Sequence, residues 1–108
     1  MSFLPASDVF RALADPTRRS LFERLAVEGE LSVAALTEGA GVSQPAVSQH
    51  LAALKAAGLV AEQKAGRRVL YRTDPQGLKP IVDWFGHYAV FWQGRFDALE
   101  QALEEMDP

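Results

Sequence analysis

The stretch Gly41–Val60, GVSQPAVSQHLAALKAAGLV, contains the signals for a turn, a helix start, a two-sided helix and a helix stop. Ser43 is a favourable N-cap because its hydroxyl can accept a hydrogen bond from a free amide of the first helical turn. Pro45 suits that turn, where the N–H that proline lacks would have no helical partner. Since Gly58 is a typical helix terminator, we expect a helix over about Ser43–Ala57.

The two sides of this expected helix differ in chemistry. One side is an apolar stripe with the i, i+4, i+7 spacing of a buried helix face, formed by Val47, Leu51 and Leu54. The opposite side is nearly uncharged, whereas a solvated face normally carries charged pairs. Such a face either packs against another part of the protein or approaches base edges in a DNA major groove. The polar groups available for base reading are Gln44, Ser48 and Gln49.

A shorter helix is expected just before this one. Ser32 can cap a helix from Val33 to about Glu38, with Leu36 facing inward. The segment Gly39-Ala40-Gly41 then supplies a tight turn. Two short helices joined by a glycine-containing turn are typical of a helix-turn-helix, which we place at about residues 32–58.

Two further helices are expected at the N-terminal end. The first covers 7–14, with Ser7 or Asp8 as its cap, and the second begins at Asp15-Pro16 and runs to about residue 27. Arg18 and Arg19 lie near the start of the second helix, where a positive charge opposes the helix dipole. They therefore either serve a phosphate or an acidic neighbour, or are simply solvated.

After Leu59 the apolar pattern changes to a period of two, which predicts a β-hairpin over about residues 59–73. Its tip is Ala65-Gly66-Arg67, followed by Arg68. A basic hairpin beside a recognition helix is a wing that reaches phosphates or the minor groove. The alternative is a tip that is basic only for solubility.

The last expected element is a long helix over residues 80–106, opened by Pro80. It carries six of the ten aromatic residues on one wide side, and a helix of about 25 residues would be roughly 38 Å long. Leaving this side in water would be costly, so we expect it to join two copies in a homodimer; the alternative is a monomer whose last helix completes the core. Gly86 and Gly94 lie on the polar side, where they mark a bend or a close partner helix. The expected interface residues are Ile81, Trp84, Phe85, Tyr88, Phe91, Trp92 and Phe96.

Length and composition limit the remaining possibilities. A chain of 108 residues suits one domain, which we place at 1–108 with a core at 7–74. The absence of cysteine excludes disulfides and thiolate metal sites. No apolar run reaches the roughly 20 residues of a membrane span, and the start MSFLPASD lacks the features of a signal peptide. We therefore expect a soluble cytoplasmic protein that does not associate with membranes.

The net charge of −3 is unusual for a nucleic-acid binder, but the charge is unevenly distributed. Residues 1–74 hold 9 lysines and arginines against 8 acidic residues, whereas residues 75–108 hold 2 against 6. The acidic excess therefore lies in the last helix, and the part that contains the expected helix-turn-helix is slightly positive.

Three stretches together resemble the ArsR family of bacterial winged-helix repressors: DVFRALADPTRRSLFERL (8–25), SVAALTEGAGVSQPAVSQHLAALKAAGLV (32–60) and GRRVLYR (66–72). The resemblance covers about residues 7–74. It implies a mostly α-helical winged helix-turn-helix with a small β-hairpin wing, dimerising through its terminal helices. It also implies a repressor that binds an imperfect palindromic operator in double-stranded DNA.

The resemblance further implies roles for single residues. Gln44, Ser48 and Gln49 look like the base-reading residues, Ser43 caps their helix and touches the DNA backbone, and the wing consists of Arg67 and Arg68. His50 falls at the margin of the buried stripe, so it is assigned a structural role or a phosphate contact.

The metal sites of the family do not carry over. The thiolate motif is absent, because Leu31-Ser32-Val33 occupies its position, and the last helix has the pair Asp83 and His87 without a matching second pair. The chain therefore resembles the branch without recognisable metal sites, and we expect no cofactor. An unidentified small apolar effector between the subunits is one interpretation of the aromatic cluster; ordinary core packing is the other.

Two other functions compete with the repressor. The first is a winged-helix module that binds a protein without specific DNA binding. The second is an enzyme, which the sequence disfavours because the chain has no cysteine, its two histidines lie on separate helices, and no glycine-rich phosphate loop follows a strand.

Overall fold

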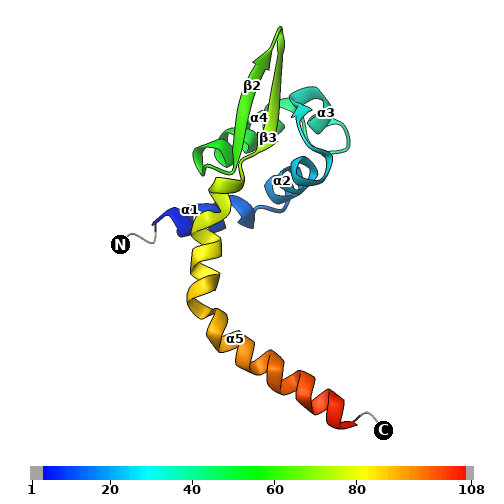
Figure 1. The fold of residues 1–108 in the computed structure, drawn as a ribbon. Helices are drawn as coiled ribbons and strands as arrows, with labels where there is room; N and C mark the ends of the chain where they lie inside the picture. Colours follow the sequence, from blue (N-terminus) through cyan, green and yellow to red (C-terminus); the bar gives the residue numbers. More distant parts are fainter. Residues whose placement is uncertain (1–3, 107–108) are drawn as a thin grey trace.

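The computed structural model describes residues 4–106, and Figure 1 shows a helical body with a projecting hairpin and a long last helix. The ends of the expected domain, residues 1–3 and 107–108, lie outside the described part. The elements in chain order are α1 (Leu4–Ala14), α2 (Pro16–Glu28), β1 (Leu31–Ser32), α3 (Val33–Thr37), α4 (Gln44–Ala56), β2 (Val60–Ala65), β3 (Arg68–Thr73), a 3₁₀ helix η1 (Pro75–Leu78) and α5 (Lys79–Met106).

The apolar stripe of α4 lies at the centre of the core. Val47, Leu51 and Leu54 are completely buried, as their spacing predicted. They share one cluster with residues of α1, α2, α3 and the sheet. Each such burial contributes roughly 1.5–3 kcal/mol, so this stripe fixes which side of α4 is left facing solvent.

N-caps were predicted for four helices of the body, and those of α2, α3 and α4 are present. Each side-chain oxygen accepts a hydrogen bond from the backbone N–H three residues on, which satisfies one otherwise free amide. The bonds are Arg18 N–H to Asp15 (2.9 Å), Ala35 N–H to Ser32 (3.1 Å) and Ala46 N–H to Ser43 (3.3 Å).

The first helix starts earlier than predicted. α1 begins at Leu4, so Ser7 and Asp8 lie inside it and cap nothing at its start. The extra turn is retained because Ala6 is buried against the body. Asp8 instead forms an ion pair with Arg11, three residues further along the same helix face, at 3.2 Å.

The two arginines at the start of α2 have a partner that the sequence did not suggest. Arg18 donates to the carbonyl of Ala12 at 3.4 Å, and Arg19 donates to the carbonyl of Leu13 at 2.9 Å. These carbonyls belong to the last turn of α1, where they have no helical partner. Both arginines therefore cap the end of the preceding helix, and the Arg19 side chain stays exposed to solvent at the same time.

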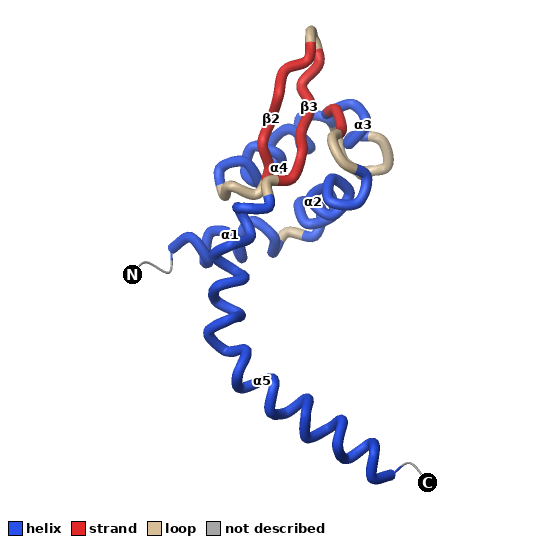
Figure 2. Tube along the Cα trace, viewed as in Figure 1, coloured by secondary structure: helices blue, strands red, loops and turns tan. Residues whose placement is uncertain are grey.

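The sheet has three strands in the order β1-β3-β2. The expected hairpin is present: β2 and β3 are antiparallel, with Val60 opposite Thr73 and Ala65 opposite Arg68 around the turn Gly66-Arg67. The strand β1 was not predicted, because two residues are too short to show a period. It pairs with the inner half of β3 and so joins the base of the hairpin to the start of α3 (Figure 2).

The 3₁₀ helix η1 packs closely on the end of α4. A Cβ placed on Gly77 would lie 1.9 Å from the carbonyl oxygen of Gly58, which is a backbone atom with little freedom to move. We therefore expect Gly77→Ala to destabilise the protein by about 1–3 kcal/mol, as overpacked sites do, measured by chemical unfolding. Gly94→Ala is the control, because its Cβ would meet nothing within 4 Å and alanine favours helix. Equal stability of the two variants would contradict this packing.

The helix α5 leaves the body beside α1 and then extends away from it, with a gentle curve where its colour passes from yellow to orange (Figure 1). Ile81 packs against the core, but every α5 residue from Val82 to Met106 is exposed in the single chain. The alternative in which the last helix completes the core is therefore wrong for all but its first turn. Among residues 4–106, no helix combines the length and the hydropathy of a bilayer span.

Candidate nucleic-acid interface

The N-terminal half of α4 presents a neutral polar surface to solvent. Gln44, Ser48 and Gln49 are all exposed, since the buried stripe of α4 lies on its other side. Within residues 4–106 none of the three side chains is engaged in an intramolecular hydrogen bond. Their donors and acceptors are therefore available to an external partner.

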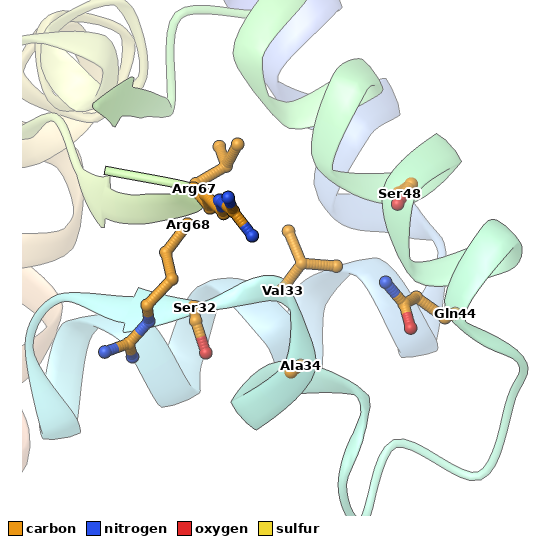
Figure 3. Close-up of a pocket in the computed structure, with 8 residues that line it drawn as sticks. Ser32, Val33, Ala34, Gln44, Ser48, Arg67 and Arg68 are labelled. Atoms are coloured by element: carbon orange, nitrogen blue, oxygen red, sulfur yellow. The ribbon is translucent and has the colours of Figure 1, made fainter. Parts of the chain in front are cut away.

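Two of these side chains, Gln44 and Ser48, face the wing across an open hollow of about 320 Å³ (Figure 3). Gln44 and Ser48 approach it from α4, and Arg67 and Arg68 approach it from the hairpin. The remaining lining residues are Ser32, Val33, Ala34 and Val69. The structure thus brings four of the six predicted DNA-binding residues around one concave surface.

The other two predicted residues lie beside this hollow. Gln49 is exposed on α4 but does not line it. Ser43 accepts the capping hydrogen bond from Ala46 N–H, which fixes the start of α4. His50 is half-buried at the edge of the apolar stripe, in keeping with the structural role that its position suggested.

The charges around the hollow are all positive. Arg67 lies in the turn and Arg68 is the first residue of β3, and both are exposed. Within the described part of the chain neither guanidinium forms an ion pair, because the salt bridges present involve other residues. No acidic residue lines the hollow, so it is suited to an anionic group such as a phosphate.

Nothing in the sequence pattern indicated that Val33, Ala34 and Val69 belong to this surface. They are small or aliphatic residues with no chemical signature of their own. Only the pairing of Ser32 with Leu70, between β1 and β3, places the start of α3 against the wing. That contact depends on a two-residue strand, which explains why the pattern alone did not reveal it.

A side-chain network attaches the wing to the far end of α4. Glu62 of β2 accepts hydrogen bonds from Lys55 of α4 and, at 2.9 Å, from the hydroxyl of Tyr71 in β3. The bond from Lys55 and then that from Tyr71 hold the pKa of Glu62 below its ordinary value. Burial, together with the bond to Glu62, raises the pKa of Tyr71 to about 12.

This network predicts a loss of stability in alkali. A raised tyrosine pKa means that folding favours the neutral phenol, so its contribution is complete below pH 10 and disappears as the pH rises through about 12. We expect the free energy of unfolding to fall by about 1–2 kcal/mol from this source between pH 10 and 12, and Tyr71→Phe to remove that part of the fall. Urea unfolding at pH 8, 10 and 11.5 measures it; identical pH dependence in both proteins would contradict the assignment.

Asp83 and His87 of α5 resemble one half of a metal site of the family, but Asp83 is engaged by another residue of the same helix. Asp83 forms an ion pair with Lys79 at 2.8 Å, one turn earlier on the helix. Among the residues that the structure describes, no cluster of three or more histidine, aspartate or glutamate side chains is placed to hold a metal ion.

The aromatic side of α5 is exposed over most of its length. Ile81 is half-buried on the body, whereas the other six predicted interface residues are between 38% and 64% exposed. The ring of Trp84, the first of these aromatic residues, meets that of Phe10 in α1 edge to face at 5.4 Å. A continuous aromatic surface of this size on an isolated chain indicates an interaction site.

Comparisons with known proteins agree with this architecture. A family described as a helix-turn-helix domain matches residues 13–63. A helix-turn-helix transcriptional regulator of Mycobacterium tuberculosis is 54% identical over 72 residues, 67% of this chain and 66% of the regulator. The arsenical resistance operon repressor of Escherichia coli is 43% identical over 69% of this chain and 64% of its own length. The chain thus spans slightly less than two thirds of these two curated relatives.

A solved structure covers more of the molecule. It is an ArsR-like transcriptional regulator from a Rhodococcus species, 31% identical to this chain, with a TM-score of 0.73 and 93% of each chain covered. The similarity in this case extends well beyond the helix-turn-helix, since it covers 93% of this chain.

Proposed function

Because the chain belongs to the ArsR family of winged helix-turn-helix transcriptional regulators, we propose that it is a DNA-binding repressor that acts as a homodimer on an imperfect palindromic operator. The observation that carries this proposal is the surface shared by α4 and the wing. Neutral amide and hydroxyl groups lie there beside two unpaired arginines, and no acidic residue lines the hollow between them.

Each part of this surface has a distinct role in the proposal. Gln44, Ser48 and Gln49 read base edges in the major groove, because amides and hydroxyls match its donor and acceptor pattern. The start of α4 also touches the DNA backbone near Ser43. Arg67 and Arg68 bind phosphates, which positions the protein without reading sequence.

The proposed dimer uses the aromatic side of α5. The body, residues 7–74, carries DNA recognition, while residues 80–106 form the dimerisation helix. Two copies related by a twofold axis would bury the exposed aromatic rings against each other and would present two α4 helices to two half-sites, one or two helical turns apart. An effector between the subunits would act through this same surface.

The proposal places the protein in the cytoplasm with no enzymatic activity. DNA-binding regulators act where the chromosome is, and binding alone accounts for repression. The surface formed by α4 and the wing then needs a DNA ligand and no cofactor.

Selection of duplexes from a random-sequence library by the purified protein tests this function. We expect enrichment of a sequence with inverted symmetry. The affinity of the protein for this sequence should fall steeply as the salt concentration rises, because binding neutralises phosphates and releases their counterions. Recovery of sequences without any shared pattern would reject the proposal and would favour a winged-helix module that binds another protein.

A further inference from the structure

Arg24 ties the end of α3 to α2, which lies beside it in Figure 1. Its Nη1 donates to the carbonyl of Leu36 at 3.3 Å and to the carbonyl of Glu38 at 2.9 Å. Its Nε donates to the carboxylate of Glu28 at 2.9 Å, which holds the guanidinium in place. One side chain of α2 therefore bonds both to its own helix and to the backbone of the next one.

The carbonyls that Arg24 binds are those that α3 leaves free. α3 has only five residues and ends at Thr37. In a continuing α-helix the carbonyl of Leu36 would accept from the N–H of Ala40, but that N–H bonds to the carbonyl of Thr37 at 3.2 Å. The guanidinium supplies two donations in its place from Nη1, while its Nε remains bonded to Glu28. A lysine would have to make all three bonds from one nitrogen at the end of a flexible chain, so we expect it to replace arginine only in part.

The segment held in this way leads directly into α4. Gly39 and Gly41 have positive φ angles of 78° and 76°, so the turn depends on two residues with little conformational preference of their own. Two residues after Gly41 comes the cap Ser43, followed by Gln44 at the edge of the hollow. A change in this turn would therefore shift the start of α4 relative to the wing.

From these contacts we infer that Arg24 is a positioning residue for sequence recognition, holding the turn between α3 and α4 so that the start of α4 meets the bases in register. This inference rests on the proposed function, because it assigns the orientation of the same surface. Recognition sites need their side chains held to within about 0.5 Å. The Arg24 guanidinium is already engaged by the two carbonyls and by Glu28, so in this inference it acts through the backbone and not by touching DNA.

Arg24→Lys and Arg24→Met test the inference on the duplex that the wild-type protein selects from a random library. A scrambled duplex of the same length and composition serves as the non-specific ligand. We expect the affinity for the selected duplex to fall about tenfold in Arg24→Met, the order of one imperfect base contact, and less in Arg24→Lys. Affinity for the scrambled duplex and the slope of log affinity against log salt should stay unchanged. Glu28→Gln is the matched control: its amide oxygen can still accept the bond from Nε, both carbonyl bonds stay in place, and the variant should bind as the wild type does.

Three outcomes would overturn the inference. A salt slope reduced by about 0.9 would mean that Arg24 neutralises a phosphate directly. Equally weakened binding to both duplexes, together with a lower melting temperature, would mean a role in stability alone. The third is wild-type hydrogen exchange at the amides of residues 39–43 in Arg24→Met, a measurement that needs no DNA. A wild-type protein that does not prefer its selected duplex would count against the proposed function, and hydrogen exchange would then still decide whether Arg24 holds the turn.

Discussion

Replacing Phe91 with glutamate is expected to convert the protein from a dimer into a folded monomer that no longer binds its operator. Phe91 is 58% exposed in the single chain, so the substitution leaves the core intact. In the proposed dimer the same position would place a carboxylate among aromatic rings. Arg95, whose guanidinium lies 4.5 Å from the centre of the Phe91 ring, would offset only part of the cost of burying that charge, which we put at about 3 kcal/mol, and the twofold axis would repeat the cost. We therefore expect the dimer dissociation constant to rise by at least about 100-fold, measured by sedimentation equilibrium.

Val90→Glu is the matched control for this experiment. Val90 is adjacent in sequence and 85% exposed, but at 100° per residue it points away from the aromatic side, towards the face that carries Asp83 and Asp97. The same added charge should leave dimerisation and DNA binding nearly unchanged there. A dimeric Phe91→Glu protein, or equal disruption by both variants, would show that the aromatic side of α5 is not the interface.

Replacing Gln49 with alanine is expected to remove most of the sequence preference while leaving non-specific binding intact. The side chain is exposed, so stability should not change. One base contact in the major groove is worth about 1–3 kcal/mol, and the substitution would remove it from both half-sites of the dimer. Titration of the selected duplex and of its scrambled counterpart measures the effect as the ratio of the two affinities.

Substitutions in the wing are expected to weaken DNA binding without changing the sequence preference. Arg67→Ala and Arg68→Ala should weaken binding to both duplexes alike and reduce the salt slope by about 0.9 for every phosphate that the protein no longer neutralises. Gln101→Ala, an amide on the exposed polar side of α5, should change neither quantity. For Gln49→Ala, an unchanged ratio of the affinities for the selected and the scrambled duplex would contradict base reading by Gln49. That conclusion would hold whatever the wing substitutions show.

Sequence patterns predicted the elements whose signals are local and chemically distinct. The caps Asp15, Ser32 and Ser43 were predicted correctly. Serine and aspartate are strongly preferred at this position because their side-chain oxygen accepts a hydrogen bond from a free amide of the first turn. The buried stripe of α4 was also correct, because its spacing matches the helical period. These local signals were sufficient to place the helix-turn-helix and to identify the solvent-facing side of its second helix.

The features that sequence did not predict depend on contacts between distant segments. β1 exists only because Leu31 pairs with Tyr71 and Ser32 with Leu70. The hydrogen bonds of Arg19 to α1 and of Arg24 to α3 join elements whose relative position no periodicity encodes. α1 starts at Leu4 and buries Ala6, whereas the capping signal at Ser7 or Asp8 pointed to a later start.

In the proposed dimer, the two α4 helices each read the bases of one half-site. The most direct test is a footprint of the wild-type dimer on the selected duplex, made with chemical probes specific for the major groove. A dimer that reads DNA through α4 should protect two major-groove patches related by the inverted symmetry of the sequence, with centres about 10 base pairs apart or a multiple of that distance. In Gln49→Ala, protection should weaken at one base position in each patch while the phosphate contacts remain. Uniform protection along the duplex, or a single patch without a symmetry-related copy, would contradict a dimeric reader that uses α4.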